Sequence, residues 1–185
     1  MRRLRKVVPL LFIGVFVPVA FASAAEPPQE PHGYKMDDFR SPTPATLQGA
    51  GVVDSDEAYE IWKKGGTVFV DVLPRAPKPP NLPPGTIWRD KPRKNIPGSV
   101  WLPNVGYGAL SPEMDRYFRD GLEAATSGDK AKPVLFYCLR DCWMSWNAAR
   151  RAMLEYGYTA VTWFPDGTDG WEEFNNPEEL SQPRP

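Results

Sequence analysis

Two runs of consecutive apolar residues constrain the fold of this chain more than any other feature. Residues 67–72 and 133–137 are dominated by β-branched, aromatic and aliphatic side chains, without the polar alternation of a half-exposed strand. Such runs predict strands that are buried on both faces. Segments with helix signals separate them, and strands that alternate with helices form a parallel sheet covered by helices on both sides.

Helix boundaries are also visible in the sequence. Asp54 precedes Glu57 by three residues, a capping-box pattern for a helix that ends at Lys64. Ser111 followed by Pro112 opens a second helix that reaches residue 125. The other expected elements are strands at 52–53, within 96–103 and at 160–164, a helix over 145–156 with Arg150 and Arg151 on a solvated face, a turn at 166–170 and a short helix at 171–174. The sequence therefore predicts an α/β fold with a central, mostly parallel five-stranded sheet and helices on both faces.

The first 25 residues have the three parts of a secretory signal peptide. Basic residues within positions 2–6 precede an apolar stretch at 7–21, and small residues follow up to Ala25. The apolar stretch is shorter than the roughly 20 residues that a transmembrane helix needs, and two prolines interrupt it. We therefore expect a signal peptide at 1–25 and no stable membrane span, with an uncleaved anchor as the alternative.

The chain without this peptide is acidic. Removing the four basic residues of the signal peptide leaves 18 Lys and Arg residues against 23 Asp and Glu residues. No basic tract accompanies them, so we expect no nucleic-acid partner. Residues 49–185 suit one globular domain. An extended arm at 26–48 precedes it, and Tyr34, Met36 and Phe39 are expected to pin the arm to the domain.

A proline-rich segment interrupts the predicted domain. Residues 73–94 contain seven prolines. Because proline lacks the N–H that a β-ladder needs, we expect a long surface loop that joins no sheet. In this topology the loop overhangs the strand ends, where it acts either as a lid or docking loop or as a plain surface insertion.

The only two cysteines lie where a predicted strand meets a helix. Cys138 follows the strand at 133–137, and Cys142 comes four residues later, before the helix. Free backbone N–H groups and the positive end of the helix dipole meet at such a junction, which favours a thiolate and binds anions. Cys138 and Cys142 are therefore the candidate catalytic residues. The candidate anion- or substrate-binding loop consists of Leu139, Arg140, Asp141 and Trp143.

Three interpretations of the two thiols remain open. Cys138 forms a persulfide that Cys142 resolves, the pair cycles between dithiol and disulfide, or the two form a permanent structural bridge. A spacing of one helical turn puts the two Cα atoms about 6 Å apart, toward the long end of disulfide geometry. A ring this small stabilises only modestly, which favours chemistry over a purely structural role.

The neighbouring residues have more than one possible role. Arg140 is either an anion contact or a solvated loop charge, and Asp141 is expected to cap the following helix. Trp143 and Trp146 lie on one side of the helix start, which favours core packing; the alternative for Trp143 is to shield the thiol or to contact a partner protein. Asp71 is expected to order the loop beside the site.

Metal and histidine chemistry are not expected. His32 is the only histidine and lies in the arm. Without a nearby imidazole there is no candidate for Cys–His catalysis, and two thiols fall short of a four-ligand zinc site. We therefore predict no metal and no cofactor.

Five segments together resemble the rhodanese domain in their order and spacing. They are residues 68–72, residues 96–103, the strand, loop and helix around Cys138, residues 157–161 and residues 165–171. The resemblance covers residues 50 to 176 and implies a rhodanese-like fold. It also implies that Cys138 is a nucleophile that accepts a sulfane sulfur as a persulfide, which backbone N–H groups of the loop stabilise.

The loop departs from the rhodanese pattern in composition and length. Asp141 and Trp143 stand where rhodanese loops usually have Gly and an Arg or hydroxyl residue. The segment from Cys138 to Gly157 also runs longer than is usual in rhodaneses. A larger and more acidic loop should suit thiosulfate less well.

A narrower resemblance concerns the arm and the second cysteine. Residues 34–44, together with the string from Cys142 to Asn147, resemble the exported PQQ-dependent catabolism-associated CXXCW-motif family. Members are encoded beside quinoprotein alcohol dehydrogenases and their cytochromes. The resemblance implies a periplasmic location, a PQQ-dependent alcohol dehydrogenase or its cytochrome as partner, and a small sulfur donor or thiol as substrate.

Two functions follow from these expectations. The first is thiol/disulfide or persulfide (sulfur transfer) chemistry through Cys138 and Cys142, as a sulfurtransferase or a thiol-disulfide exchange protein. The second is a non-catalytic binding or assembly module for a quinoprotein dehydrogenase or cytochrome, in which the two cysteines form a structural disulfide.

Overall fold

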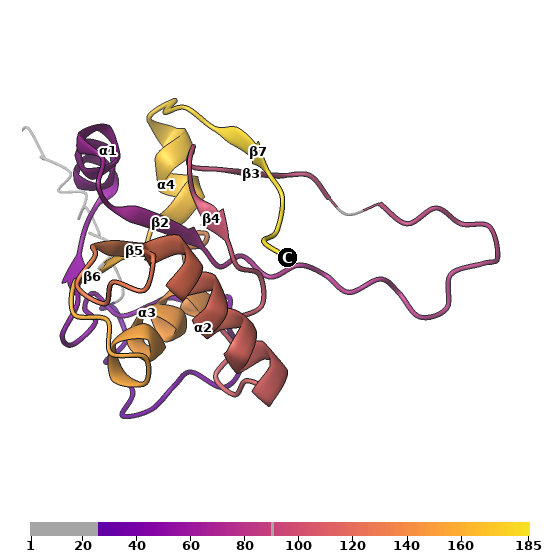
Figure 1. Cartoon of the computed structure of the whole chain (residues 1–185), viewed down its shortest axis with the longest axis horizontal. Coiled ribbons are helices and arrows are strands. Elements are labelled where there is room, and N and C mark those ends of the chain that lie inside the picture. Colours follow the sequence, from indigo (N-terminus) through magenta and orange to yellow (C-terminus); the bar gives the residue numbers. More distant parts are fainter. Residues whose placement is uncertain (1–25, 90) are drawn as a thin grey trace, which may run out of the picture.

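The computed structural model describes residues 26–89 and 91–185, and the predicted signal peptide lies outside them. Figure 1 shows the course of the chain. The elements in chain order are β1 (Gly51–Val52), α1 (Ser55–Lys64), β2 (Val68–Asp71), β3 (Arg93–Asn95), β4 (Val100–Trp101), α2 (Pro112–Thr126), β5 (Val134–Tyr137), α3 (Trp143–Leu154), β6 (Val161–Phe164), α4 (Gly167–Glu173) and β7 (Glu179–Ser181).

Five of the strands form one sheet in the order β1-β6-β5-β2-β4, and every pairing between neighbours is parallel. The strand β5 lies in the middle of this sheet, paired with β2 on one side and β6 on the other. The predicted α/β class, with a five-stranded parallel sheet and helices on both faces, is confirmed.

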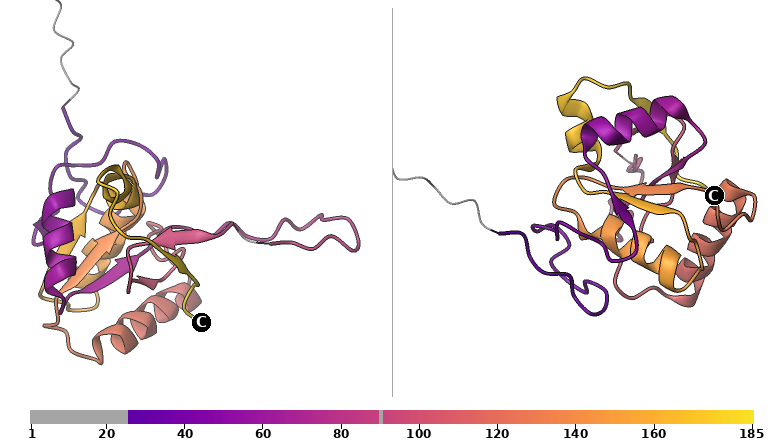
Figure 2. Two further views of the ribbon diagram at one scale, coloured as in Figure 1. Left: turned by 90° about the horizontal axis from the view of Figure 1, so that it is seen from above. Right: turned by 90° about the vertical axis from the view of Figure 1, so that its left-hand side faces the viewer.

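The two faces of the sheet carry separate hydrophobic clusters. On one face, Phe136 and Trp163 pack with residues of α2 and α3, including Phe118 and Trp146. On the other face, the β5 residues Leu135 and Tyr137 pack with residues of α1 and α4. Figure 2 shows the helices on the two sides of the sheet. Because successive side chains of a strand point to opposite faces, β5 supplies both clusters and is buried along its whole length.

The first two helices begin where the sequence predicts. Asp54 caps α1 and forms the complete capping box with Glu57, and Ser111 accepts the N–H of Met114 at the start of α2. Two later helices begin earlier than expected. The helix α3 starts at Trp143 rather than residue 145, and α4 starts at Gly167 within the predicted turn.

A second, two-stranded sheet was not predicted. The strands β3 and β7 pair antiparallel, with Lys94 opposite Leu180. The expectation that residues 73–94 join no sheet is therefore wrong at Arg93 and Lys94, which follow the last proline of the segment and have free N–H groups to pair. The described remainder of the segment, residues 73–89, 91 and 92, forms no strand or helix and extends away from the body of the domain (Figure 1).

The arm at 26–48 contains no helix or strand and lies along α3. Tyr34 donates a hydrogen bond to Glu155, and the ring of Phe39 packs edge-on against Tyr107. Met36 is 61% exposed, so it pins the arm less than the sequence suggested. Among residues 26–89 and 91–185, no helix combines the length and hydrophobicity needed to cross a bilayer.

Candidate functional site

The two cysteines form a disulfide at the junction between β5 and α3. Cys138 follows the last residue of β5, and Cys142 is the N-cap residue of α3. Their Cα atoms are 6.3 Å apart, in agreement with the spacing expected from one helical turn. The structure therefore brings the two predicted catalytic residues into direct contact.

Both sulfur-bearing residues are buried. Cys138 is 0% exposed and Cys142 is 1% exposed, and both belong to the hydrophobic cluster that α2 and α3 form with the sheet. A partner thiol therefore has no direct path to either sulfur in this conformation. Any exchange reaction requires the loop or a covering segment to move first.

Backbone groups of the loop already have partners. The N–H of Arg140 donates to the carboxylate of Asp169 at 3.1 Å, and the N–H of Trp143 donates to the carbonyl of Phe39 in the arm at 3.0 Å. The carbonyl of Cys138 accepts the N–H of Thr168 at 3.0 Å. At least two of the N–H groups expected to hold an anion are thus satisfied by the protein itself.

The side chain of Arg140 binds carboxylates of α4 and its N-cap. Its Nε lies 3.0 Å from Asp166, and its two terminal nitrogens contact the carboxylate of Glu173 at 2.6 and 2.8 Å. This bidentate pair lowers the pKa of Glu173, with the hydrogen bonds from Arg140 as the largest cause. Arg140 therefore ties the loop to α4, with its charge matched by two acidic groups.

Asp141 does not cap α3, which corrects the expectation from the sequence. Cys142 occupies the N-cap position and makes no side-chain cap hydrogen bond. Asp141 is exposed and has a φ of 53°, in the left-handed region that aspartate tolerates better than most residues. Asp141 therefore forms the turn of the chain between the two cysteines.

Trp143 and Trp146 are buried and hold the arm. Their rings pack edge to face with centroids 5.4 Å apart. The indole N–H of Trp143 donates to the hydroxyl of Ser41 and the carbonyl of Pro42, both at 3.1 Å. The indole N–H of Trp146 donates to the carbonyl of Thr46 at 3.1 Å. The two side chains thus combine core packing with fixation of the arm beside Cys142.

Asp71 connects the loop after β2 to the cysteine loop. It accepts the N–H of Leu73 at 2.9 Å and the Nε of Arg93 at 2.7 Å. Arg93 donates from Nη1 to the hydroxyl of Thr168 at 3.3 Å, and Thr168 bonds the carbonyl of Cys138. Burial raises the pKa of Asp71, and the opposing effect of Arg93 is smaller.

The sequence does not predict that Arg93 and Thr168 link Asp71 to the carbonyl of Cys138. The polar string Arg-Lys-Asn of β3 gave no sign of burial, yet Arg93 and Asn95 point inward while Lys94 is exposed. The alternation of buried and exposed residues in β3 arises only when β3 pairs with β7, which lies far away in the sequence. Thr168 lay inside a segment predicted as a turn.

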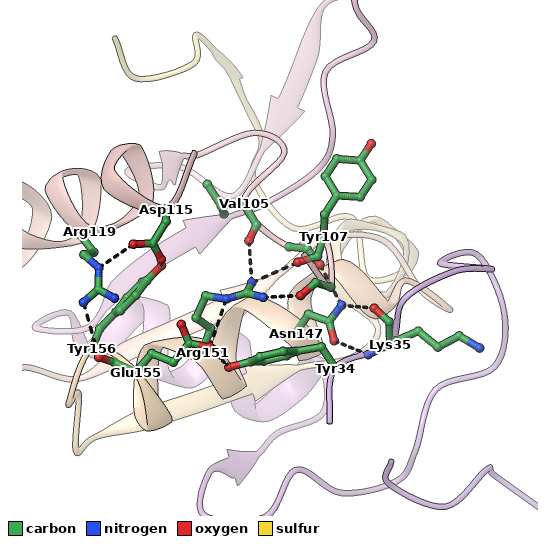
Figure 3. A network of polar contacts seen from close by, with 12 residues as sticks. Tyr34, Lys35, Val105, Tyr107, Asp115, Arg119, Asn147, Arg151, Glu155 and Tyr156 are labelled. Atoms are coloured by element: carbon green, nitrogen blue, oxygen red, sulfur yellow. Dashed lines mark hydrogen bonds and ion pairs between the residues drawn. The ribbon is translucent and has the colours of Figure 1, made fainter. Parts of the chain in front are cut away.

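Asn147 and Arg151 were also missed, and Arg151 contradicts its expected place on a solvated face. Its guanidinium is buried and donates to three carbonyls of the segment after β4, those of Val105, Tyr107 and Gly108. Figure 3 shows this network, with Tyr34 of the arm beside Arg151. Nothing in the sequence distinguishes Arg151 from the neighbouring Arg150, which is half-buried and donates to the carbonyl of His32 in the arm at 2.9 Å.

Cavities beside the proline-rich loop lie away from the two cysteines. A cavity of 740 Å³ and another of 470 Å³ adjoin the proline-rich loop, and neither cysteine lines them. Among residues 26–89 and 91–185, no three His, Cys, Asp or Glu side chains are grouped as a metal site would need. The arrangement supports thiol–disulfide chemistry at Cys138 and Cys142, in a loop that is bonded to several carboxylates.

Comparisons with known proteins find distant likenesses in structure. No family model and no curated protein matches the chain. The BH2092 protein of Bacillus halodurans is 21% identical with a TM-score of 0.45, and the match covers 70% of this chain and 77% of that one. The polysulfide-sulfur transferase of Wolinella succinogenes is 15% identical with a TM-score of 0.44, covering 72% and 80%. An uncharacterized protein from Saccharomyces cerevisiae is 21% identical with a TM-score of 0.40, covering 68% and 92%. Likenesses this distant leave the chemistry of this chain to be argued from its own residues.

Proposed function

We propose that this chain is a periplasmic thiol–disulfide exchange protein in which Cys138 and Cys142 cycle between disulfide and dithiol. The observation that carries the proposal is a disulfide between residues only four positions apart, at a strand-to-helix junction. Such a small ring removes little conformational freedom from the unfolded chain, so its contribution to stability is about 2 kcal/mol. A bridge kept for stability alone is better placed between distant elements.

The position of Cys142 favours it as the leaving group. A helix N-terminus stabilises negative charge, and Cys142 is the N-cap of α3. Once the loop or the covering segment has moved to expose Cys138, a partner thiolate attacks its Sγ, the bond between the two sulfurs breaks, and the electron pair of that bond remains on Cys142. Cys138 then carries a mixed disulfide, the intermediate through which thiol–disulfide exchange proceeds.

A second thiol of the same partner completes the reaction. As a thiolate it attacks the partner's sulfur in the mixed disulfide and releases Cys138. The partner dithiol thereby becomes a disulfide and loses two electrons and two protons, which the Cys138–Cys142 pair gains as a dithiol. The same steps run in reverse when the dithiol form meets an oxidised partner.

The proposed exchange is tested with a synthetic peptide that contains two reduced cysteines. The folded oxidised protein is mixed with excess peptide, quenched with acid and analysed by mass spectrometry. We expect the protein to gain 2 Da (roughly two hydrogens per reduced disulfide) as the peptide loses the same mass. A Cys142→Ala variant should accumulate a mixed disulfide with the oxidised peptide on Cys138. A Cys138→Ala variant that exchanges as well as the wild type rules the proposal out.

Persulfide transfer is the alternative reaction at these cysteines, and the loop supports it less well than thiol–disulfide exchange. The N–H groups of Arg140 and Trp143 have protein partners, and Asp166, Asp169 and Glu173 surround the loop with negative charge. An anionic sulfur donor such as thiosulfate meets repulsion there. Reduced protein that gains about 32 Da from a sulfane donor, one sulfur atom, would move the proposal from thiol exchange to sulfur transfer.

Burial favours a second candidate, a binding or assembly module with a permanent disulfide. Both cysteines are covered, and the arm is bonded to Trp143 next to Cys142. If this candidate is right, the disulfide of the folded protein resists mild reductant, and the peptide assay above gives no exchange.

We further propose that the physiological partner belongs to a PQQ-dependent alcohol oxidation system, on the strength of the sequence resemblance of residues 34–44 and 142–147. The test uses the Cys142→Ala variant as bait in periplasmic extract, followed by release of disulfide-linked proteins with reductant. A quinoprotein dehydrogenase or its cytochrome among the released proteins supports the association. Release of unrelated proteins alone contradicts it.

A further inference from the structure

The base of the proline-rich loop encloses a cavity that the disulfide chemistry does not use. The cavity has a volume of 470 Å³, within the range of small-molecule sites. Its lining includes Pro74, Trp88, Lys91, Arg93, Trp101 and Glu172. Two neighbouring cavities, of 740 and 470 Å³, share Arg75 and Trp88 with it. Together they form one hollow that follows the loop.

The charge of this hollow is opposite to that of the chain as a whole. Six cationic side chains and the carboxylate of Glu172 line the three cavities among the described residues, and two of the six cations have carboxylate partners, Arg93 with Asp71 and Lys94 with Glu178. The cationic residues are Arg75, Lys78, Arg89, Lys91, Arg93 and Lys94. In a chain whose acidic residues outnumber its basic ones, this concentration produces a local positive potential. The hollow therefore selects for negatively charged ligands.

Arg93 provides an unused hydrogen-bond donor in the cavity wall. It is 9% exposed, its Nε binds Asp71 and its Nη1 binds Thr168, but its Nη2 is buried without a hydrogen-bond partner in the described part of the chain. A buried donor without a hydrogen-bond partner is energetically unfavourable. Because Nη2 is itself buried, an acceptor group on a ligand reaches it only after a small shift of the Arg93 side chain or the cavity wall.

Two tryptophans give the cavity flat apolar walls. Trp101 is buried and fixed by a hydrogen bond from its indole N–H to the carbonyl of Leu73 at 2.9 Å. Trp88 is exposed and lines all three cavities. Aromatic faces favour stacking with planar rings. Pro74 and Pro92 add further apolar surface.

Glu172 opposes an anion less than its formal charge suggests. Burial raises the pKa of Glu172, and a hydrogen bond with Glu178 raises it further. The carboxyl group therefore holds its proton to a higher pH than an exposed glutamate, which lessens the repulsion between Glu172 and an anionic ligand.

We propose that this cavity binds an organic dianion with a planar ring system, held by its ring against Trp88 and Trp101 and by its acidic groups at Lys91 and Arg93. Size, wall composition and charge all favour a small molecule over an inorganic anion. Neither cysteine lines the cavity, so the proposal can be tested separately from the proposed exchange reaction.

The test is isothermal titration calorimetry on the chain without its first 25 residues, in its oxidised form. Naphthalene-2,6-dicarboxylate is the probe, naphthalene-2,6-dimethanol is its neutral counterpart, and adipate is a dicarboxylate without a ring. We expect the probe to bind at least 10-fold more tightly than either, with an affinity that falls as salt increases. Lys91→Gln should weaken binding of the probe at least 10-fold. Lys64→Gln, an exposed lysine at the end of α1, should leave it unchanged.

Three results overturn the proposal. Equal binding of the neutral compound would mean that the charge of the hollow is irrelevant. Equal binding by Lys91→Gln, with a circular dichroism spectrum like that of the wild type, would place the ligand elsewhere. A hexaglutamate peptide that binds more tightly than the dicarboxylate, and loses affinity in Lys91→Gln, would assign the hollow to an acidic segment of a protein partner instead.

Discussion

Asn147 and Lys35 are joined by two hydrogen bonds that run in opposite directions. The backbone N–H of Lys35 donates to Oδ1 of Asn147 and Nδ2 of Asn147 donates to the carbonyl of Lys35, both at 2.9 Å (Figure 3). The same amide donates to the carbonyl of Gly106 at 2.9 Å. One buried side chain therefore connects the arm, α3 and the segment after β4. Asn147 follows Trp146, which also holds the arm.

Asn147→Ala should release the arm and destabilise the domain. The substitution leaves two backbone carbonyls and one N–H without partners, each worth about 1–3 kcal/mol where it stays buried. We expect a loss of about 2–4 kcal/mol in urea denaturation and faster cleavage of residues 26–48 by protease. Asn81→Ala, an exposed asparagine in the proline-rich loop, is the matched control and should behave like the wild type. Unchanged proteolysis of the arm would contradict the role given to Asn147.

Gly167→Ala should disturb the contact between α4 and the cysteine loop. A Cβ atom at Gly167 would lie 2.4 Å from the carbonyl oxygen of Cys138, and the residue has a φ of 53°. The strained backbone alone costs about 1–2 kcal/mol, to which the clash with main-chain atoms adds. We expect a destabilisation of more than 2 kcal/mol (about the backbone cost plus the clash). Gly33→Ala has open space around its Cβ and should cost less than half as much. Equal effects of the two variants would refute this packing.

Asp115 should make the stability of the fold depend on pH in the acid range. Hydrogen bonds from Arg119 and Tyr156 lower the pKa of Asp115 below its ordinary value of 3.8. The unfolded chain therefore takes up this proton first. The stabilisation is fully present above that ordinary value and is lost as pH falls through the lower pKa of the folded state.

The measurement is the free energy of unfolding from about pH 5 to pH 2. Wild type should lose stability more steeply than Asp115→Asn below about pH 4. Asp120→Asn, an exposed aspartate on the same helix, should keep the slope of the wild type. A wild-type slope in Asp115→Asn would show that the carboxylate is not held by its two partners.

Asp71→Asn should be among the most destabilising substitutions in the domain. It removes the partner of Arg93 at 2.7 Å and leaves a buried cation without a counter-charge. Breaking a buried pair in this way costs about 3–5 kcal/mol. The double variant Asp71→Asn, Arg93→Met should recover part of that loss, because it removes the stranded charge. Additive effects of the two single substitutions in a double-mutant cycle would contradict a direct interaction.

The five-stranded parallel sheet and the proximity of the two cysteines could be predicted from the sequence. The runs at 67–72 and 133–137 indicate burial on both faces. Because Cys138 follows the second run directly, the sequence places it at the carboxyl end of a buried strand. The caps at Asp54 and Ser111 are local, since each joins residues only three positions apart. Local hydrogen bonds of this kind are visible in a sequence.

Long-range partners were beyond the reach of the sequence. Arg140 meets Glu173 and Arg93 meets Asp71 only after strands and helices far apart in the chain have packed. The N-cap role fell to Cys142 because the turn at Asp141 brings the helix start one residue later than a capping aspartate would. Arg151 looked like a surface residue, because only the folded chain places three carbonyls around it.

The reduction potential of the Cys138–Cys142 pair tests the proposed exchange most directly. The folded protein is equilibrated in buffers of graded dithiol-to-disulfide ratio, and its free thiols are alkylated with a maleimide reagent and counted by mass. A pair that exchanges with partners should be half reduced at a potential above about −300 mV, without unfolding of the domain. A potential below that value, or reduction only after denaturation, would mean that the disulfide is a permanent structural bridge and would contradict the proposed function.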